Sequence, residues 1–143
     1  MPSITNTIDI KANPDDVWAV LADMPATRHW LPGVTAARMD GDVRVCQMAD
    51  GQEIHERISD ISPDRRSYRF QHLRVPLPVG QSSGTFTVTD GPDPHTATVT
   101  LRTTFEPLDP SNDQLSDMIH GAFQQSLDSL RGYLEDKTPW DAS

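Results

Sequence analysis

Apolar and polar residues alternate near the start of the chain, where Ile4, Ile8 and Ile10 fall on the same side of an extended segment. A spacing of two residues puts these side chains on one face, because successive side chains of a β-strand point to opposite sides. We therefore predict a first strand over residues 4–10 with one face buried.

Helical spacing replaces this alternation at Asn13. An asparagine followed by Pro14 is typical of a helix start, because the asparagine accepts hydrogen bonds from the first N–H groups and proline fits the first turn. Residues 13–23 are thus expected to form a short helix. Residues 25–30 are expected to add a second brief helical turn, which ends where Pro32-Gly33 bends the chain.

The segment 34–106 carries five or six short runs of alternating polarity, each bounded by turn residues. The turn signals are Asp40-Gly41, Asp50-Gly51, Ser62-Pro63-Asp64, Pro76-Leu77-Pro78 and Asp90-Gly91-Pro92. Strands joined by such turns form an antiparallel meander, whereas parallel strands need long crossover connections, usually helical. We predict one antiparallel sheet, with the first strand added at its edge.

A long helix is predicted over residues 111–135, because Ser111 and Gln114 have the spacing of a capping box and apolar residues follow at helical intervals. Its apolar face carries Leu115, Met118, Ile119, Ala122, Phe123, Ser126, Leu130, Tyr133 and Leu134. Ala122, Ser126 and Ser129 form a shallow groove there, which either receives a ligand or packs closely against the sheet. Residues 136–143 are expected to fray.

Length and charge narrow the class of protein. A chain of 143 residues suits one domain, spanning residues 1–143. The 21 acidic and 12 basic residues give a net charge of −9 without any charged run, which argues against nucleic acid or an anionic membrane as a partner. Cys46 is the single cysteine, so no internal disulfide can form and a cytoplasmic location is the default expectation. Membrane insertion is not expected, since no apolar stretch approaches the ~20 residues of a membrane span.

Several short segments together carry a family resemblance. They are residues 14–23 around Val17-Trp18, Trp30-Leu31-Pro32-Gly33, Gly41 with Arg44, Asp50-Gly51 with Glu56-Arg57, Tyr68, Phe105-Glu106-Pro107 and residues 127–134. Their order resembles the START-like (SRPBCC) superfamily of polyketide cyclases and dehydrases, lipid-transport domains and Bet v 1-type proteins. The resemblance covers residues 3–135. It implies an α+β helix-grip fold, in which a curved antiparallel sheet of six to seven strands wraps around the C-terminal helix and two short helices follow the first strand.

The resemblance also implies a cavity between the sheet and the long helix. Within the expected fourth strand, Glu56 interrupts an apolar row formed with Ile54 and Ile58. A three-residue hairpin loop at Ala49-Asp50-Gly51 would place Arg44 opposite Glu56. A two-residue turn would shift the register by one and place valines there instead. The superfamily favours the first register, because the matching acid of its receptors points into the ligand cavity; the alternative is an exposed Glu56 without a role.

Tyr68, Phe70 and His72 share a face of the next expected strand, and the resemblance places this face in the cavity. A histidine transfers protons near neutral pH, and a nearby carboxylate supports that role. Glu56 and His72 are therefore the candidate catalytic acid and base. The alternative is that His72 serves only as a hydrogen-bonding group at the rim.

Eleven further positions are expected to bind the ligand, since the resemblance turns them toward the cavity. They are Trp30, Arg44, Cys46, Met48, Ile54, Phe86, Leu101, Thr103, Met118, Ala122 and Ser126. Core packing is the competing interpretation for the aromatic and small residues among them.

No other recognised chemistry emerges from the sequence. His29, His55, His72, His95 and His120 lack the spacing of metal ligands, and Cys46 has no companion. No glycine-rich phosphate loop or nucleophile elbow is present in the sequence. We therefore expect neither a metal nor another cofactor.

Three functions remain open: a protein that binds a hydrophobic lipid, polyketide or aromatic metabolite, an enzyme of the polyketide cyclase or dehydratase kind, and a co-chaperone-like module that binds other proteins. A cavity above ~300 Å³ lined by Glu56, Phe70 and Ser126 is expected for the first two, and a filled interior for the third. The chain is expected to act as a monomer or a homodimer.

Overall fold

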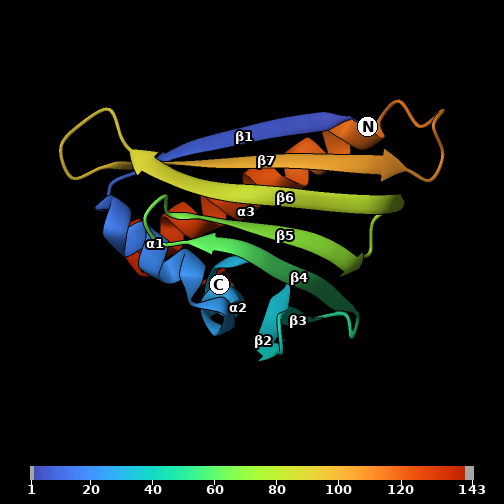
Figure 1. The fold of residues 1–143 in the computed structure, drawn as a ribbon, viewed down its shortest axis with the longest axis horizontal. Coiled ribbons are helices and arrows are strands. Elements are labelled where there is room, and N and C mark those ends of the chain that lie inside the picture. Colours follow the sequence, from blue (N-terminus) through green and yellow to red (C-terminus); the bar gives the residue numbers. More distant parts are fainter. Residues whose placement is uncertain (1, 141–143) are drawn as a thin grey trace.

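A computed structural model describes residues 2–140 of this chain. One antiparallel sheet contains the seven strands β1 (Ser3–Ile10), β2 (Val34–Asp40), β3 (Val43–Met48), β4 (Glu53–Ser62), β5 (Ser67–Arg74), β6 (Val79–Asp90) and β7 (Ala97–Pro107). The order across the sheet is β1-β7-β6-β5-β4-β3-β2, so the first strand lies at one edge beside the last, as predicted (Figure 1). The intervening strands are sequential hairpins, which confirms the predicted meander.

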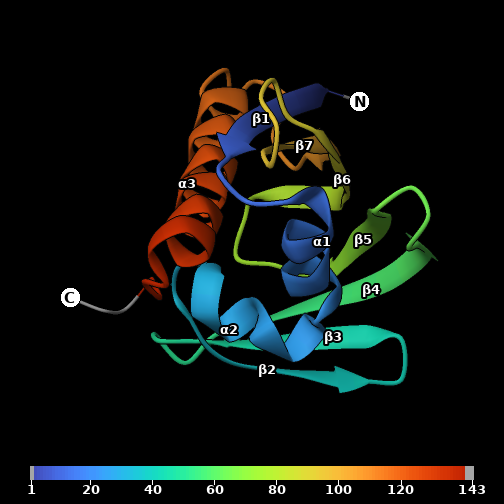
Figure 2. The same ribbon diagram turned by 90° about the vertical axis from the view of Figure 1, so that its left-hand side faces the viewer.

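The helices are α1 (Pro14–Ala22), the 3-10 turn η1 (Met24–Ala26), α2 (Thr27–Trp30) and α3 (Leu115–Asp136). Figure 2 shows α3 along the concave side of the sheet, with α1 and α2 at one end of the molecule. A strongly curved sheet closed by one long helix is the predicted helix-grip arrangement. Within the described residues, no helix is long and apolar enough to cross a membrane.

The strand β1 alternates exposed and buried residues along its whole length. Its buried face includes Asn6, whose Nδ2 donates to the carbonyl of His120 and to Gln124 Oε1, both at 3.1 Å. The side-chain amide of Gln124 in turn donates to the Thr7 carbonyl at 3.4 Å. The Lys11 backbone N–H donates to a carboxylate oxygen of α3 at 2.9 Å. Polar side chains therefore join α3 to β1 alongside the apolar packing.

The start of α3 differs from the prediction, because the helix begins at Leu115 and not at Ser111. The Ser111 N–H and hydroxyl both donate to Asp109 Oδ1, at 3.0 and 2.6 Å. The predicted capping box does not form, because the Ser111 hydroxyl binds Asp109 and not the first N–H groups of the helix. These bonds hold Ser111 in a separate turn.

The apolar face of α3 is also rotated relative to the prediction. Met118 is 47% exposed, whereas Leu127, absent from the predicted face, is fully buried. The buried side chains centre on Ile119, Leu127 and Leu130, which puts Met118 about a third of a turn away, on the solvent side.

The C-terminal segment, where fraying is expected from residue 136, makes hydrogen bonds as far as Trp140. The Trp140 N–H donates to the His29 carbonyl at 3.1 Å, and its indole Nε1 lies 2.9 Å from the carbonyls of both Arg28 and Val34. This segment therefore bonds to α2 and to the start of β2. The rest of the expected tail, residues 141–143, lies outside the described residues.

Candidate functional site

The β3–β4 hairpin sets the register of the site. Gly51 adopts a left-handed conformation (φ +90°), and its N–H donates to the Met48 carbonyl at 3.0 Å. The Met48 N–H donates to the Gln52 carbonyl at 2.8 Å, which closes a loop of three residues. Arg44 consequently lies opposite Glu56 in the ladder. The first of the two predicted registers is confirmed.

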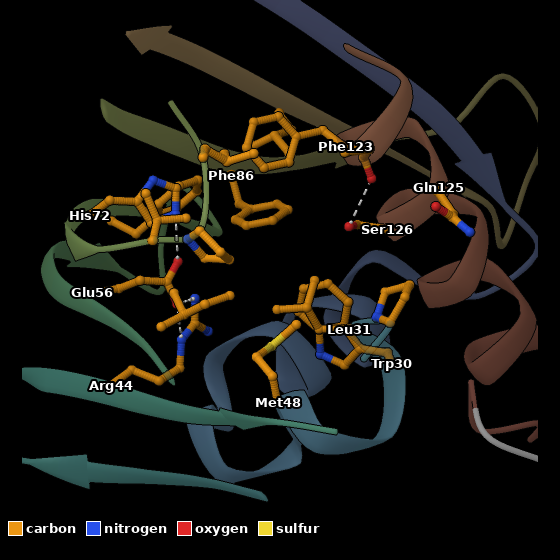
Figure 3. A pocket seen from close by; sticks show the side chains of 18 residues that line it. Trp30, Leu31, Arg44, Met48, Glu56, His72, Phe86, Phe123, Gln125 and Ser126 are labelled. Carbon is orange, nitrogen blue, oxygen red and sulfur yellow. Dashed lines mark hydrogen bonds and ion pairs between the residues drawn. The ribbon is translucent and has the colours of Figure 1, made fainter. Parts of the chain in front are cut away.

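Arg44 and Glu56 form a buried ion pair on the concave face of the sheet. Arg44 Nε and Nη2 lie 3.0 and 2.9 Å from Glu56 Oε1, and the two side chains are only 2% and 5% exposed (Figure 3). A charge this deeply buried is costly unless it is paired, so each side chain depends on the other for its ionised state.

Further contacts hold the Arg44 guanidinium in place. Its Nη1 donates to Thr27 Oγ1 at 3.1 Å and to the Tyr68 hydroxyl at 3.3 Å, and lies 3.5 Å from the sulfur of Met24. The guanidinium also lies over the Tyr68 ring, 5.8 Å from its centroid. Thr27 belongs to α2, so these bonds connect the sheet to the short helices that close one end of the molecule.

The ion pair determines the protonation states of both groups. Burial alone would raise the pKa of Glu56, but the Arg44 charge and contacts with His72 outweigh burial and lower that pKa from 4.5 to about 2. Burial likewise opposes the charged form of Arg44, yet the Glu56 charge raises the Arg44 pKa above its ordinary value. Glu56 is therefore a carboxylate at neutral pH, which can accept hydrogen bonds but has no proton to donate.

His72 lies on the other side of the Glu56 carboxylate. Its Nε2 is 3.4 Å from Glu56 Oε2 and its Nδ1 is 3.0 Å from Ser82 Oγ, while its side chain is 6% exposed. The imidazole also packs against the Phe70 ring at a centroid distance of 5.2 Å. The geometry thus brings the two predicted acid/base residues together, and Ser82 is an additional neighbour that the sequence did not indicate.

A cavity of about 230 Å³ adjoins this network, between the concave face of the sheet, α2 and α3. The predicted residues that line it are Trp30, Arg44, Met48, Ile54, Glu56, Phe70, His72, Phe86, Leu101, Ala122 and Ser126. Exposed lining residues on α3 and in the 75–77 loop mark its mouth. The volume is below the predicted ~300 Å³, because aromatic side chains from α2, the sheet and α3 occupy much of the interior.

Four predicted positions do not line the cavity. Tyr68 lies behind the ion pair, where its hydroxyl accepts from Arg44. Cys46 is completely buried, which raises the pKa of its thiol to about 12, and Thr103 is buried where β7 pairs with β6. Met118 points to solvent because α3 is rotated as described above.

The cavity wall includes seven residues absent from the prediction, namely Leu31, Pro32, Val75, Pro76, Leu77, Phe123 and Gln125. The first two continue the Trp30-Leu31-Pro32 motif, and Phe123 stands on the predicted apolar face of the helix. The proline-bounded loop was visible as a turn, but its folding back over the cavity had no signal in the sequence.

The structure brings together no cluster of three or more His, Cys, Asp or Glu side chains able to hold a metal ion, as far as residues 2–140 are concerned. The lining side chains also include no lysine, and the one arginine is already paired with Glu56. The cavity thus offers an apolar wall with one internally neutralised charge pair. Such a wall suits a small organic molecule.

The curved sheet, the enclosing helix and the internal cavity define a START-like helix-grip protein. Residues 1–135 match the family described as polyketide cyclase / dehydrase and lipid transport, and the chain belongs to this family. Comparison with proteins of curated function finds no match.

Several solved structures share this fold. Protein XoxI from Bacillus cereus is 26% identical, with a TM-score of 0.87 over 96% of this chain and 98% of that one. The Zhui aromatase/cyclase from a Streptomyces species is 20% identical, with a TM-score of 0.73 over 95% and 94%. A START superfamily protein from Mycobacterium smegmatis is 11% identical, with a TM-score of 0.75 over 95% and 99%.

Proposed function

We propose that this protein binds one compact, largely apolar and uncharged molecule in the cavity, with the Arg44–Glu56–His72 network as its polar anchor. The observation that carries the proposal is an apolar cavity that meets a buried charge pair whose charges cancel. A charged ligand would lack a counter-ion there, whereas a neutral one would bury its apolar surface at no electrostatic cost.

Glu56 is the group proposed to orient the ligand. Arg44 occupies Glu56 Oε1 with two bonds, while Oε2 has only the 3.4 Å contact with His72. A carboxylate accepts about four hydrogen bonds. Oε2 therefore has room for a hydroxyl or N–H group of the ligand.

Binding is tested with indane, a neutral two-ring hydrocarbon, by isothermal titration calorimetry. The Ser126→Trp variant should abolish the heat of binding, because Ser126 lines the cavity and is only 7% exposed. Ser116→Trp, the same change at an exposed position of α3, should bind indane as the wild type does. If Ser126→Trp does not fold, Ala122→Trp at the exposed mouth provides the same block. Equal binding by the wild type and all these variants contradicts the proposal.

Native mass spectrometry of freshly purified protein identifies the natural ligand. A co-purified neutral molecule that Ser126→Trp and Ala122→Trp both exclude would support carriage in the cavity. A molecule retained by both variants would bind elsewhere and contradict the assignment of this site.

A second candidate function is proton transfer of the cyclase or dehydratase kind, with His72 as the base. The contact of His72 with both Glu56 and Ser82 favours it, because the carboxylate and the hydroxyl hold the imidazole in one orientation. The aromatase/cyclase activity of the Zhui relative is compatible with such a role.

Proton transfer is tested with 2-indanone, a ketone of suitable size whose protons next to the carbonyl exchange in D₂O. An enzyme with this chemistry would accelerate exchange above the buffer rate by proton NMR, and His72→Gln would remove the acceleration while retaining indane binding. Exchange at the buffer rate in the wild type would leave binding as the function and refute the catalytic role.

A further inference from the structure

Trp30 lines the cavity and carries an unpaired polar atom. Among the described residues, its indole Nε1 is buried without a hydrogen-bond partner, and the whole side chain is 1% exposed. The other buried polar side chains of the wall are all paired: Arg44 with Glu56, Glu56 with His72, and Ser126 with the Ala122 carbonyl. Trp30 thus supplies the one buried donor that the protein leaves free at this cavity.

A buried indole N–H usually has a partner, because removing a donor from water without replacing its hydrogen bond is unfavourable. Indole is a donor only, so the missing partner must be an acceptor. A single water molecule would be a poor partner, since a buried water needs two to four polar neighbours and the surrounding wall is mainly apolar. The free donor is therefore matched to an acceptor on the ligand.

The position of Trp30 is fixed by its packing. Its ring meets Phe86 edge-on at a centroid distance of 6.0 Å, and α2 places it on the opposite side of the cavity from the Glu56–His72 pair (Figure 3). The cavity consequently presents a donor on its helical side and an acceptor, the Glu56 carboxylate, on its sheet side.

The cavity volume limits the size of the ligand. An apolar cavity of about 150 Å³ holds benzene. The cavity of about 230 Å³ is roughly one and a half times as large, which corresponds to two fused rings. Longer acyl chains and extended poly-ketone chains exceed this space and would have to project through the mouth.

We infer that the ligand is a neutral molecule of about two fused rings whose carbonyl oxygen accepts a hydrogen bond from Trp30 Nε1. This inference rests on the proposed binding function and adds the class of ligand to it. The carbonyl lies at the α2 side, so that a hydroxyl or N–H on the far ring reaches Glu56.

The test compares 1-indanone with indane, two bicyclic molecules of nearly equal size that differ in the carbonyl group. We expect 1-indanone to bind the wild type about tenfold more tightly by calorimetry, because the carbonyl satisfies a buried donor that indane leaves unpaired. In NMR spectra of the ¹⁵N-labelled protein, the indole N–H resonance of Trp30 should shift far more on adding 1-indanone than on adding indane.

Trp30→Phe should remove the preference for 1-indanone, so that the variant binds 1-indanone and indane with similar affinity, whatever the smaller ring does to both affinities together. Trp18→Phe is the matched control, because Trp18 packs against the core without lining the cavity, and it should keep the preference. If Trp30→Phe does not fold, the two ligands and the NMR shift in the wild type decide the question alone.

The outcomes separate this inference from the proposed function. If both molecules bind with equal affinity and the Trp30 resonance shifts equally, the carbonyl contact is wrong while the binding cavity stands. If neither molecule binds, the proposed function fails and this inference fails with it.

Discussion

Arg44 and Glu56 allow a direct measurement of how strongly the site depends on its charge pair. The Arg44→Met variant leaves Glu56 buried without a counter-ion, Glu56→Gln leaves Arg44 in the same condition, and the double variant removes both charges. Urea unfolding of the four proteins gives a double-mutant cycle. The coupling energy is the difference between the stability lost by the double variant and the sum of the losses of the two single variants.

The structure sets the expected magnitude. At the observed 2.9 Å between Arg44 Nη2 and Glu56 Oε1, the attraction is roughly 6 kcal/mol at an effective dielectric constant of about 20. Desolvation of the two ions offsets much of this attraction in the intact pair. Removing one partner leaves the desolvation penalty of the remaining charge without any compensating attraction. Each single variant should therefore lose ~3–5 kcal/mol of unfolding free energy, and the double variant should recover much of that loss.

A matched pair on the same hairpin serves as control. Arg57 and Asp42 lie 3.5 Å apart, but their side chains are 48% and 66% exposed. The cycle with Arg57→Met and Asp42→Asn should give a coupling below ~1 kcal/mol, because solvent screens exposed charges. A coupling of this small size for Arg44 and Glu56 would refute the claim that their pairing organises the site.

Three further predictions concern pH, packing and the C-terminal segment. Because the pKa of Glu56 is lowered from 4.5 to about 2 by folding, the stability it contributes is complete above pH 4.5 and is lost as the pH falls toward 2. Urea unfolding across that range should show the wild type losing roughly 3 kcal/mol more than the Arg44→Met, Glu56→Gln double variant, and equal losses would contradict the lowered pKa. A methyl group at Gly84 would overlap the Phe70 ring, so Gly84→Ala should cost ~1–3 kcal/mol in urea unfolding, whereas Gly121→Ala, which meets no neighbour, should not destabilise. Trp140→Ala should speed hydrogen exchange of the α2 amides severalfold, since it removes the contacts of the indole Nε1 with the Arg28 and Val34 carbonyls, and unchanged exchange would show that these contacts do not hold the helix.

The sequence was sufficient for the fold, whereas at the centre of the site local signals left two registers open and the family resemblance favoured the one that the structure has. Gly51 favours a left-handed position, and such a position in a three-residue hairpin loop determines which residues face one another across β3 and β4. The pairing of Arg44 with Glu56 follows from that register alone. The alternation along β5 gives the face of His72, but its position opposite Glu56 depends on the β4–β5 register, which shifts between His55 and Glu56.

The rest of the cavity depends on contacts between distant parts of the chain, which leave no periodic pattern. The 75–77 loop covers the cavity because of where β5 and β6 end, and its own residues indicate only a turn. Met118 belongs to the apolar face expected for α3, whereas the face buried against the sheet is turned toward Leu127. Ser111 had the spacing of a cap, but competition from Asp109 decided the outcome.

The polar bonds between α3 and β1 have a consequence for assembly. An edge strand presents unpaired backbone groups, to which another chain can add by strand pairing. At β1, the Gln124 side chain donates a hydrogen bond to the Thr7 carbonyl. Glu135 accepts one from the N–H of Lys11, just beyond the strand. The helix that forms one wall of the cavity therefore also occupies part of the hydrogen-bonding edge at β1, where a second chain would otherwise pair.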